Sequence, residues 1–153
     1  MLRILHIIPL MIGLASPLHA QTLIGDWNCL EQLPEGEVHS QVTFKPNGRM
    51  HAKIQYKIAF PDAEILGTAR YKGKFGYTAE GHLTDIPMSA KITSLTGNGM
   101  DIKNSEFARQ LKAALLEDNG TLAEIKVLTS SQLVIRADGR DITCKRPQGY
   151  LGS

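Results

Sequence analysis

The twelve residues from Arg49 to Phe60, RMHAKIQYKIAF, constrain the fold more than any other stretch of this 153-residue chain. Apolar or aromatic side chains stand at every second position from Met50 to Phe60, and the positions between them are mainly Lys, His and Gln. Such alternation is typical of a strand with one buried face, because successive side chains of a strand point to opposite faces. The chain must therefore supply further strands that pair with this one.

Turn sequences on both sides predict antiparallel neighbours for this strand. Asn47-Gly48 lies between two alternating segments, which is the strongest short-range sign of a hairpin. Pro87 lacks a backbone N–H, so we expect the strand that contains it to bulge or to lie at an edge. The strands expected in this half of the chain span residues 39–45, 49–60, 65–78 and 82–95.

The periodicity then changes from two to that of a helix. In EFARQLKAALLED (106–118), the residues Phe107, Leu111, Ala114 and Leu115 fall on one side at helical spacing. Asn104 or Ser105 is a suitable N-cap, and Asn119-Gly120 is a suitable stop. We expect one amphipathic helix over residues 105–117.

Three more short strands follow the helix, and one precedes residue 39. They are expected at residues 23–30, 122–129, 132–137 and 140–146, which brings the total to eight. Eight antiparallel strands joined by tight turns suggest a sandwich or a barrel, and a barrel leaves no strand edge exposed. The predicted fold is all-β with one helix: a closed eight-stranded up-and-down barrel, with the helix inserted between strands five and six.

The first twenty residues have the pattern of a secretory signal peptide. A cation, Arg3, precedes an apolar stretch of about 12 residues, and Ala20 ends the segment as a small residue at the expected cleavage point. A membrane-spanning helix needs roughly 20 apolar residues, so we expect cleavage rather than anchoring. The predicted organisation is a signal peptide (1–20), one domain (21–147) and a flexible tail (148–153), in the periplasm or outside the cell.

Export changes the interpretation of the two cysteines. In an oxidising compartment Cys29 and Cys144 are expected to form a disulfide rather than a metal site. If the first and last strands are antiparallel neighbours, that bridge pairs residues whose numbers sum to 173. Trp27 then lies opposite Arg146, close enough for the guanidinium to rest on the indole.

A Gly-x-Trp on the first strand, here Gly25-Asp26-Trp27, together with an Arg near the end of the last strand resembles the barrel-closing pair of the lipocalins and the wider calycin group. The segment EIKVLTSSQLVIRADGRDITCKR is similar to the closing hairpins of small bacterial lipocalin-like domains. The resemblance implies a secreted barrel of this type. The helix departs from it, because the usual lipocalin helix follows the eighth strand.

A PDAE turn at residues 61–64 predicts that strands three and four pair residues whose numbers sum to 125. Large inward residues then face small ones, for example Tyr56 with Ala69 and Ala52 with Gly73. Such an interior is either filled by side chains or hollow enough for one small ligand. The helix likewise either completes the core or covers the mouth opposite Trp27. The candidate ligand-binding residues are Ile54, Tyr56, Tyr71, Phe75, Phe107 and Leu111.

The outer face of the same two strands is basic. This register sets Lys53 against Lys72 and His51 beside Lys74, and like charges in direct opposition are unfavourable. The stripe is either a surface for an anionic partner or a solvated wall. The candidate partner surface comprises Lys53, Lys57, Arg70, Lys72 and Lys74. Without residues 1–20 the chain has 16 Lys and Arg (17 less Arg3) against 15 Asp and Glu, so its net charge names no partner and gives no sign of nucleic-acid binding.

Catalytic and metal-binding signals are weak. The histidines His39, His51 and His82 lie on separate expected strands, and no His-x-x-His, Cys-x-x-Cys or Gly-x-Ser-x-Gly spacing occurs. We therefore expect no catalytic residue, no metal and no cofactor, and a binding protein rather than an enzyme.

Two functional hypotheses follow. The first is an exported, lipocalin-like protein that binds a small hydrophobic or amphipathic ligand under the helix. The second is a protein-interaction module, such as an inhibitor or immunity protein of an envelope enzyme, in which the barrel is a rigid scaffold.

Overall fold

The computed structural model describes residues 23–117 and 122–148, so the predicted signal peptide, the Asn119-Gly120 helix stop and most of the predicted tail lie outside the described residues. The elements are β1 (Gly25–Leu33), β2 (Gly36–Phe44), β3 (Arg49–Phe60), β4 (Ala63–Tyr77), β5 (His82–Gly97), β6 (Met100–Asp101), α2 (Glu106–Leu116), β7 (Leu122–Leu128), β8 (Gln132–Ala137) and β9 (Arg140–Lys145).

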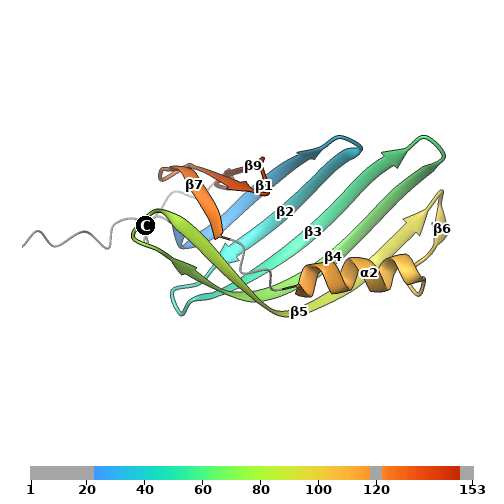
Figure 1. The fold of residues 1–153 in the computed structure, drawn as a ribbon, viewed down its shortest axis with the longest axis horizontal. Helices are drawn as coiled ribbons and strands as arrows, with labels where there is room; N and C mark the ends of the chain where they lie inside the picture. Colours follow the sequence, from blue (N-terminus) through green and yellow to red (C-terminus); the bar gives the residue numbers. More distant parts are fainter. Residues whose placement is uncertain (1–22, 118–121, 149–153) are drawn as a thin grey trace, which may run out of the picture.

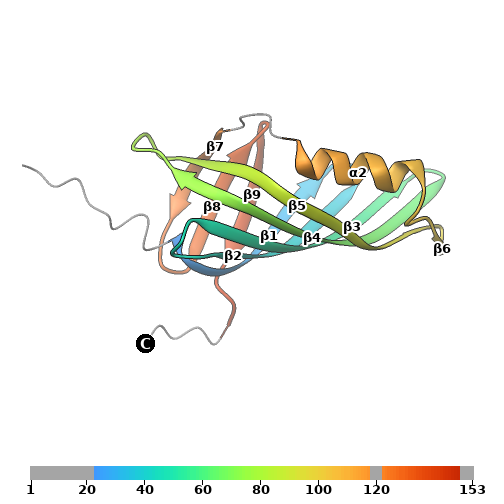
Figure 2. The same ribbon diagram turned by 90° about the horizontal axis from the view of Figure 1, so that it is seen from below.

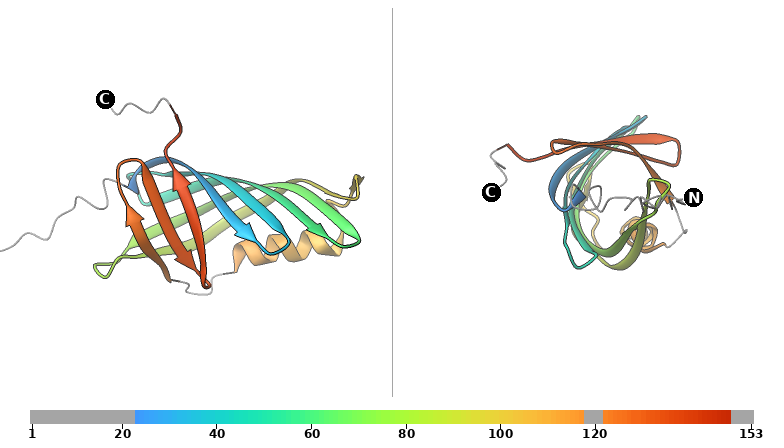
Figure 3. Two further views of the ribbon diagram at one scale, coloured as in Figure 1. Left: turned by 90° about the horizontal axis from the view of Figure 1, so that it is seen from above. Right: turned by 90° about the vertical axis from the view of Figure 1, so that its left-hand side faces the viewer.

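All the strands belong to one antiparallel sheet, in the order β4-β3-β2-β1-β9-β8-β7-β5-β6. An additional pairing of β4 with β5 closes eight of them into a ring, and the two-residue β6 only extends β5 as a hairpin. The end-on view in Figure 3 shows this closed outline. The all-β prediction with one helix is confirmed. The expected count of eight strands was one short, because β6 is too short to show as an alternating pattern.

The ring is uneven in length. Strands β1 to β5 are long and extend beyond the short strands β7 to β9 (Figure 1). Helix α2 lies lengthwise on β5, over the part of the sheet that β7 to β9 leave uncovered (Figure 2). The helix begins at the expected N-cap, since the Ser105 side chain accepts a hydrogen bond of 3.2 Å from the Ala108 amide.

The expected seam between the first and last strands is present. β1 pairs with β9 so that Cys29 lies opposite Cys144, and the numbers of paired residues sum to 173, as predicted. The two cysteines form a disulfide, and the Arg146 guanidinium carbon lies 3.8 Å from the centre of the Trp27 ring. Arg146 also donates to the carbonyl oxygens of Ile24 and Asp26. It therefore holds the start of β1 at the end of β9.

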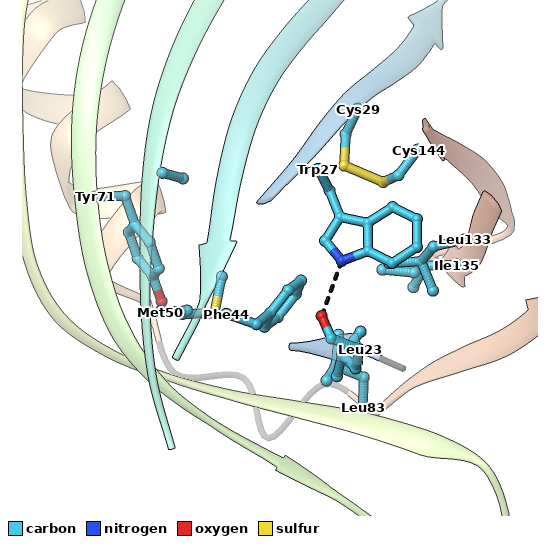
Figure 4. Packing of buried hydrophobic residues seen from close by; sticks show 11 residues of the cluster. Leu23, Trp27, Cys29, Phe44, Met50, Tyr71, Leu83, Leu133, Ile135 and Cys144 are labelled. Carbon is cyan, nitrogen blue, oxygen red and sulfur yellow. Dashed lines mark hydrogen bonds between the residues drawn. A yellow bond between two sulfur atoms is a disulfide. The ribbon is translucent and has the colours of Figure 1, made fainter. Parts of the chain in front are cut away.

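Trp27 occupies the centre of the main hydrophobic core. Its side chain is fully buried, and its indole N–H donates to the Leu23 carbonyl at 2.8 Å. Figure 4 shows the ring between the disulfide on one side and Leu133 and Ile135 on the other. A second, smaller core lies under α2, where Ala108 packs with Ile65 and Leu95. Each part of the ring thus has its own buried cluster.

The predicted register of the third and fourth strands was wrong by two residues. The structure pairs Phe60 with Ala63, so only Pro61 and Asp62 form the turn and paired numbers sum to 123 rather than 125. Asn98, from the β5–β6 turn, braces this tighter turn, because its side chain accepts from the Glu64 amide and donates to the Asp62 carbonyl. A shift of two residues keeps every side chain on its predicted face.

Removal of the disulfide should lower stability substantially. The bridge spans 115 positions of the sequence, so in the chain-entropy model a Cys29→Ala/Cys144→Ala variant loses on the order of 4 to 5 kcal/mol of unfolding free energy. Urea unfolding, followed by Trp27 fluorescence, measures the loss. Reductant should lower the midpoint of the wild type and leave that of the variant unchanged. A wild-type midpoint that is insensitive to reductant would contradict the prediction.

Candidate functional site

An open cavity of about 490 Å³ lies on the inner side of the ring, and some of its lining residues, such as Asp85, Ala114 and Asp138, are exposed to solvent. All eight strands of the ring contribute to its wall, and the last turn of α2 closes part of it. Its lining comprises Glu31, Val38, Ser40, Val42, Met50, Ala52, Ile54, Tyr56, Tyr71, Leu83, Asp85, Pro87, Ala114, Leu115, Glu117, Ala123, Ala137, Asp138 and Ile142. Most of these side chains are apolar, and on β2 and β3 they follow each other at every second position.

The space arises because large inward residues face small ones. In the observed register Tyr56 pairs with Gly67 and Met50 with Gly73, whereas Ala52 pairs with Tyr71. The glycine at position 73 leaves room for two polar groups: an added Cβ would lie 2.6 Å from the Asp85 carboxylate and 2.7 Å from the Tyr71 hydroxyl, so these groups would have to move. The alternation of large and small residues was predicted, although the individual partners were not.

One polar pair lies in the wall of this apolar cavity. The Tyr71 hydroxyl donates a hydrogen bond of 2.6 Å to the Asp85 carboxylate. Asp85 faces the inside because β5 contains a bulge opposite Lys72 and Gly73, which sets Asp85 across from Phe75. Sequence analysis did not select Asp85. The only available signal was Pro87, which correctly suggested an irregularity in this strand.

A second polar region lies near Tyr56. Burial of the phenol, and secondarily the nearby Glu31 carboxylate, raise the pKa of Tyr56 to about 12. Glu31 itself accepts a hydrogen bond of 2.7 Å from Arg140 Nε. The cavity therefore offers hydroxyl groups and carboxylates at a few points of a mostly apolar surface.

The candidate ligand-binding residues fall into two groups. Ile54, Tyr56 and Tyr71 line the cavity, whereas the other three candidates do not. Phe75 packs edge-on against Phe44, with ring centres 4.9 Å apart, and Leu111 packs on the core under the helix. Phe107 is 39% exposed. The buried residue of α2 is Ala108 rather than Phe107. The residues of this helix that line the cavity are Ala114 and Leu115.

The candidate partner surface lies on the opposite side of the same strands. A groove of about 660 Å³ along β1 to β4 is lined by Lys53, Arg70 and Lys72, together with Asp26, His51, neutral polar residues and a few apolar ones. The observed register sets Lys53 opposite Arg70 and His51 opposite Lys72. Lys74 adjoins this row, while Lys57 pairs with Leu66 and lines a separate groove.

The described residues thus define a class of protein: a closed antiparallel ring with a mostly apolar interior cavity, one disulfide at its seam and one helix beside it. In comparisons with known proteins, no family model matches the chain and no curated protein is significantly similar to it in sequence. Within residues 23–117 and 122–148, no helix is long and apolar enough to span a bilayer, and His, Cys, Asp and Glu form no group of three suited to a metal.

Tyr56 should make the protein sensitive to high pH. A tyrosine whose folded pKa exceeds its usual value near 10 contributes stability that is complete below pH 10 and lost as the pH rises to 12. Two pKa units correspond to roughly 2 to 3 kcal/mol. We expect the unfolding free energy of the wild type to fall more steeply between pH 10 and 12 than that of Tyr56→Phe. Parallel pH profiles would contradict the raised pKa.

Proposed function

We propose that this chain is an exported, lipocalin-like binding protein that holds one small hydrophobic or amphipathic molecule inside the ring. The observation that carries the proposal is the interior cavity, to which all eight ring strands contribute side chains. Its volume of about 490 Å³ falls within the range of roughly 300 to 1,000 Å³ that is typical of small-molecule sites.

The chemistry of the lining favours a ligand with a long apolar part and one polar group. Side chains such as Val42, Met50 and Ile54 offer an apolar surface, against which a hydrocarbon part would be buried from water. The Tyr71–Asp85 pair offers a hydrogen-bonding point within the same cavity. Tyr71 is buried and Asp85 is exposed, so this part-buried pair can fix the orientation of a ligand more than it adds to affinity.

The lipocalin-like assignment is supported by the closing pair. Gly25-x-Trp27 begins the first strand, and Arg146 lies on the indole from the end of the last strand, as the resemblance implies. The position of α2, before the three closing strands, remains a departure from the lipocalin arrangement. Export is supported by the Cys29–Cys144 disulfide, because such bridges persist in oxidising compartments such as the periplasm. Binding, rather than catalysis, is the proposed activity.

Ala114 and its neighbour Ala113 provide a matched test. Both side chains are exposed, but Ala114 lines the cavity from α2 and Ala113 does not. Trp at position 114 would occupy the ligand space, so Ala114→Trp should weaken binding of the neutral apolar probe N-phenylnaphthylamine about tenfold or more. Ala113→Trp should bind like the wild type. Fluorescence titration measures both affinities.

A complementary measurement is native mass spectrometry of protein purified from an exporting host. We expect the wild type to carry a non-covalent adduct that Ala114→Trp lacks. Equal probe affinity in both tryptophan variants, or no binding of apolar molecules by the wild type, would contradict the proposed function.

A further inference from the structure

The outer wall of β3, β4 and β5 carries a dense set of positive charges. We define the basic face by Arg49, His51, Lys53, Arg70, Lys72, Lys74 and Lys91. Cations oppose each other directly across the strands in the pairs Arg49–Lys74, Lys53–Arg70 and Arg70–Lys91. Opposed residues of antiparallel strands have Cβ atoms roughly 4.5 to 5.5 Å apart, and like charges at that distance repel.

Within the described residues, no cation of this face forms an ion pair. The ion pairs found there involve Arg109, Lys126, Arg136, Arg140 and His39, none of which belongs to the basic face. Asp26 is the one acidic residue that lines the outer groove; it accepts a hydrogen bond of 2.6 Å from the Thr43 hydroxyl, and a single carboxylate offsets only part of the charge of Lys53, Arg70 and Lys72. The repulsion is thus retained in the folded protein, which favours an anionic partner at this surface.

The local electrostatics at His51 agree with this description. Partial burial lowers the pKa of His51, and the positive charges of Lys45, Lys72 and Arg49 lower it further. The neighbouring cations thus disfavour protonation of this imidazole. It lies in the groove of about 660 Å³, which the cations Lys53, Arg70 and Lys72 share with neutral side chains such as Asn28, Gln41 and Thr43.

Exposed apolar side chains adjoin the same face. Ile86 lies directly across from Lys74, and both Ile86 and Met88 are 51% exposed. Met88 is the extra residue of the β5 bulge, between Pro87, which faces Gly73, and Ser89, which faces Lys72. A soluble anion would bind the cations but would leave these two apolar side chains exposed to water. Their position beside the cations therefore favours a partner that also has an apolar part.

We propose that this outer wall docks the protein on an anionic lipid bilayer. The basic face lies against the phosphate groups, and Ile86 and Met88 enter the boundary between headgroups and acyl chains. This is the combination that peripheral binding requires: electrostatic attraction to anionic lipid and a small buried apolar area. This surface lies on the outside of the ring, so the bilayer would not contact the interior cavity. The docking proposal therefore does not depend on the function proposed for that cavity.

Vesicle co-sedimentation tests the docking. The wild type should sediment with vesicles of equimolar phosphatidylcholine and phosphatidylglycerol, and not with phosphatidylcholine alone. Binding should fall steeply as salt rises from about 0.1 to 1 M, because screening shortens the range of the attraction from roughly 10 to 3 Å. Absence of binding to the anionic vesicles overturns the proposal.

Charge reversal identifies the surface. Lys72→Glu/Lys74→Glu should weaken vesicle binding at least about tenfold, since each basic residue near an anionic membrane contributes about a factor of five. The new carboxylates would lie opposite His51 and Arg49, so the fold should be at least as stable as the wild type. The matched control is Lys103→Glu/Lys112→Glu, which changes the net charge equally at exposed residues elsewhere. Equal weakening by both variants overturns the assignment to this face.

Two further measurements separate the alternatives. Ile86→Ser/Met88→Ser should also weaken vesicle binding, and unchanged binding would overturn insertion of the apolar pair. Binding of heparin, a soluble polyanion, without binding of anionic vesicles would assign the face to polyanions and overturn membrane docking. All these variants should keep wild-type affinity for N-phenylnaphthylamine, so a failure of docking is distinguishable from a failure of the cavity.

Discussion

The contact between the first and last strands determines the rest of this structure. A sheet becomes a ring only if its two ends meet in one register. Here two contacts fix that register, the Cys29–Cys144 disulfide and the Trp27–Arg146 pair, and they lie two residues apart along the strands. The covalent bridge restricts the unfolded chain, whereas the indole fills the core where the short strands β7 to β9 meet the long ones. Without this seam the chain would have two free strand edges and no enclosed interior.

Closure explains why a chain of modest size can have a cavity at all. Side chains would fill a ring of eight strands if every inward position were large. Here Gly67, Ala69 and Gly73 interrupt the large residues of β3 and β4, and the glycine at 73 leaves room for the Tyr71 hydroxyl and the Asp85 carboxylate. The sequence therefore uses small residues twice: to admit a hydrogen-bonded pair and to leave space beside it.

The strand pattern, the closing register and the helix cap were predictable because each depends on local periodicity or on one unique pair of residues. The β3–β4 register was not, since four turn residues and two turn residues both agree with the PDAE sequence, and the choice is stabilised by Asn98 from a distant turn. Asp85 was missed for a similar reason: its inward position depends on a bulge whose location Pro87 suggests but does not determine. The face of the helix was predicted only in part, because Ala108, a small residue, is its most buried member.

The two halves of α2 contact different parts of the ring: one half packs on a core and the other borders the cavity. Ala108 and Leu111 pack on Ile65 and Leu95, so the first half closes the hydrophobic core under the long strands. Ala114 and Leu115 belong to the last turn and face the interior space. The first half anchors the helix, and in the last turn the small side chain of Ala114 takes little space from the cavity. The basic face lies on the outside of β3 and β4. A ligand in the ring and an anionic surface outside would therefore contact opposite faces of these two strands.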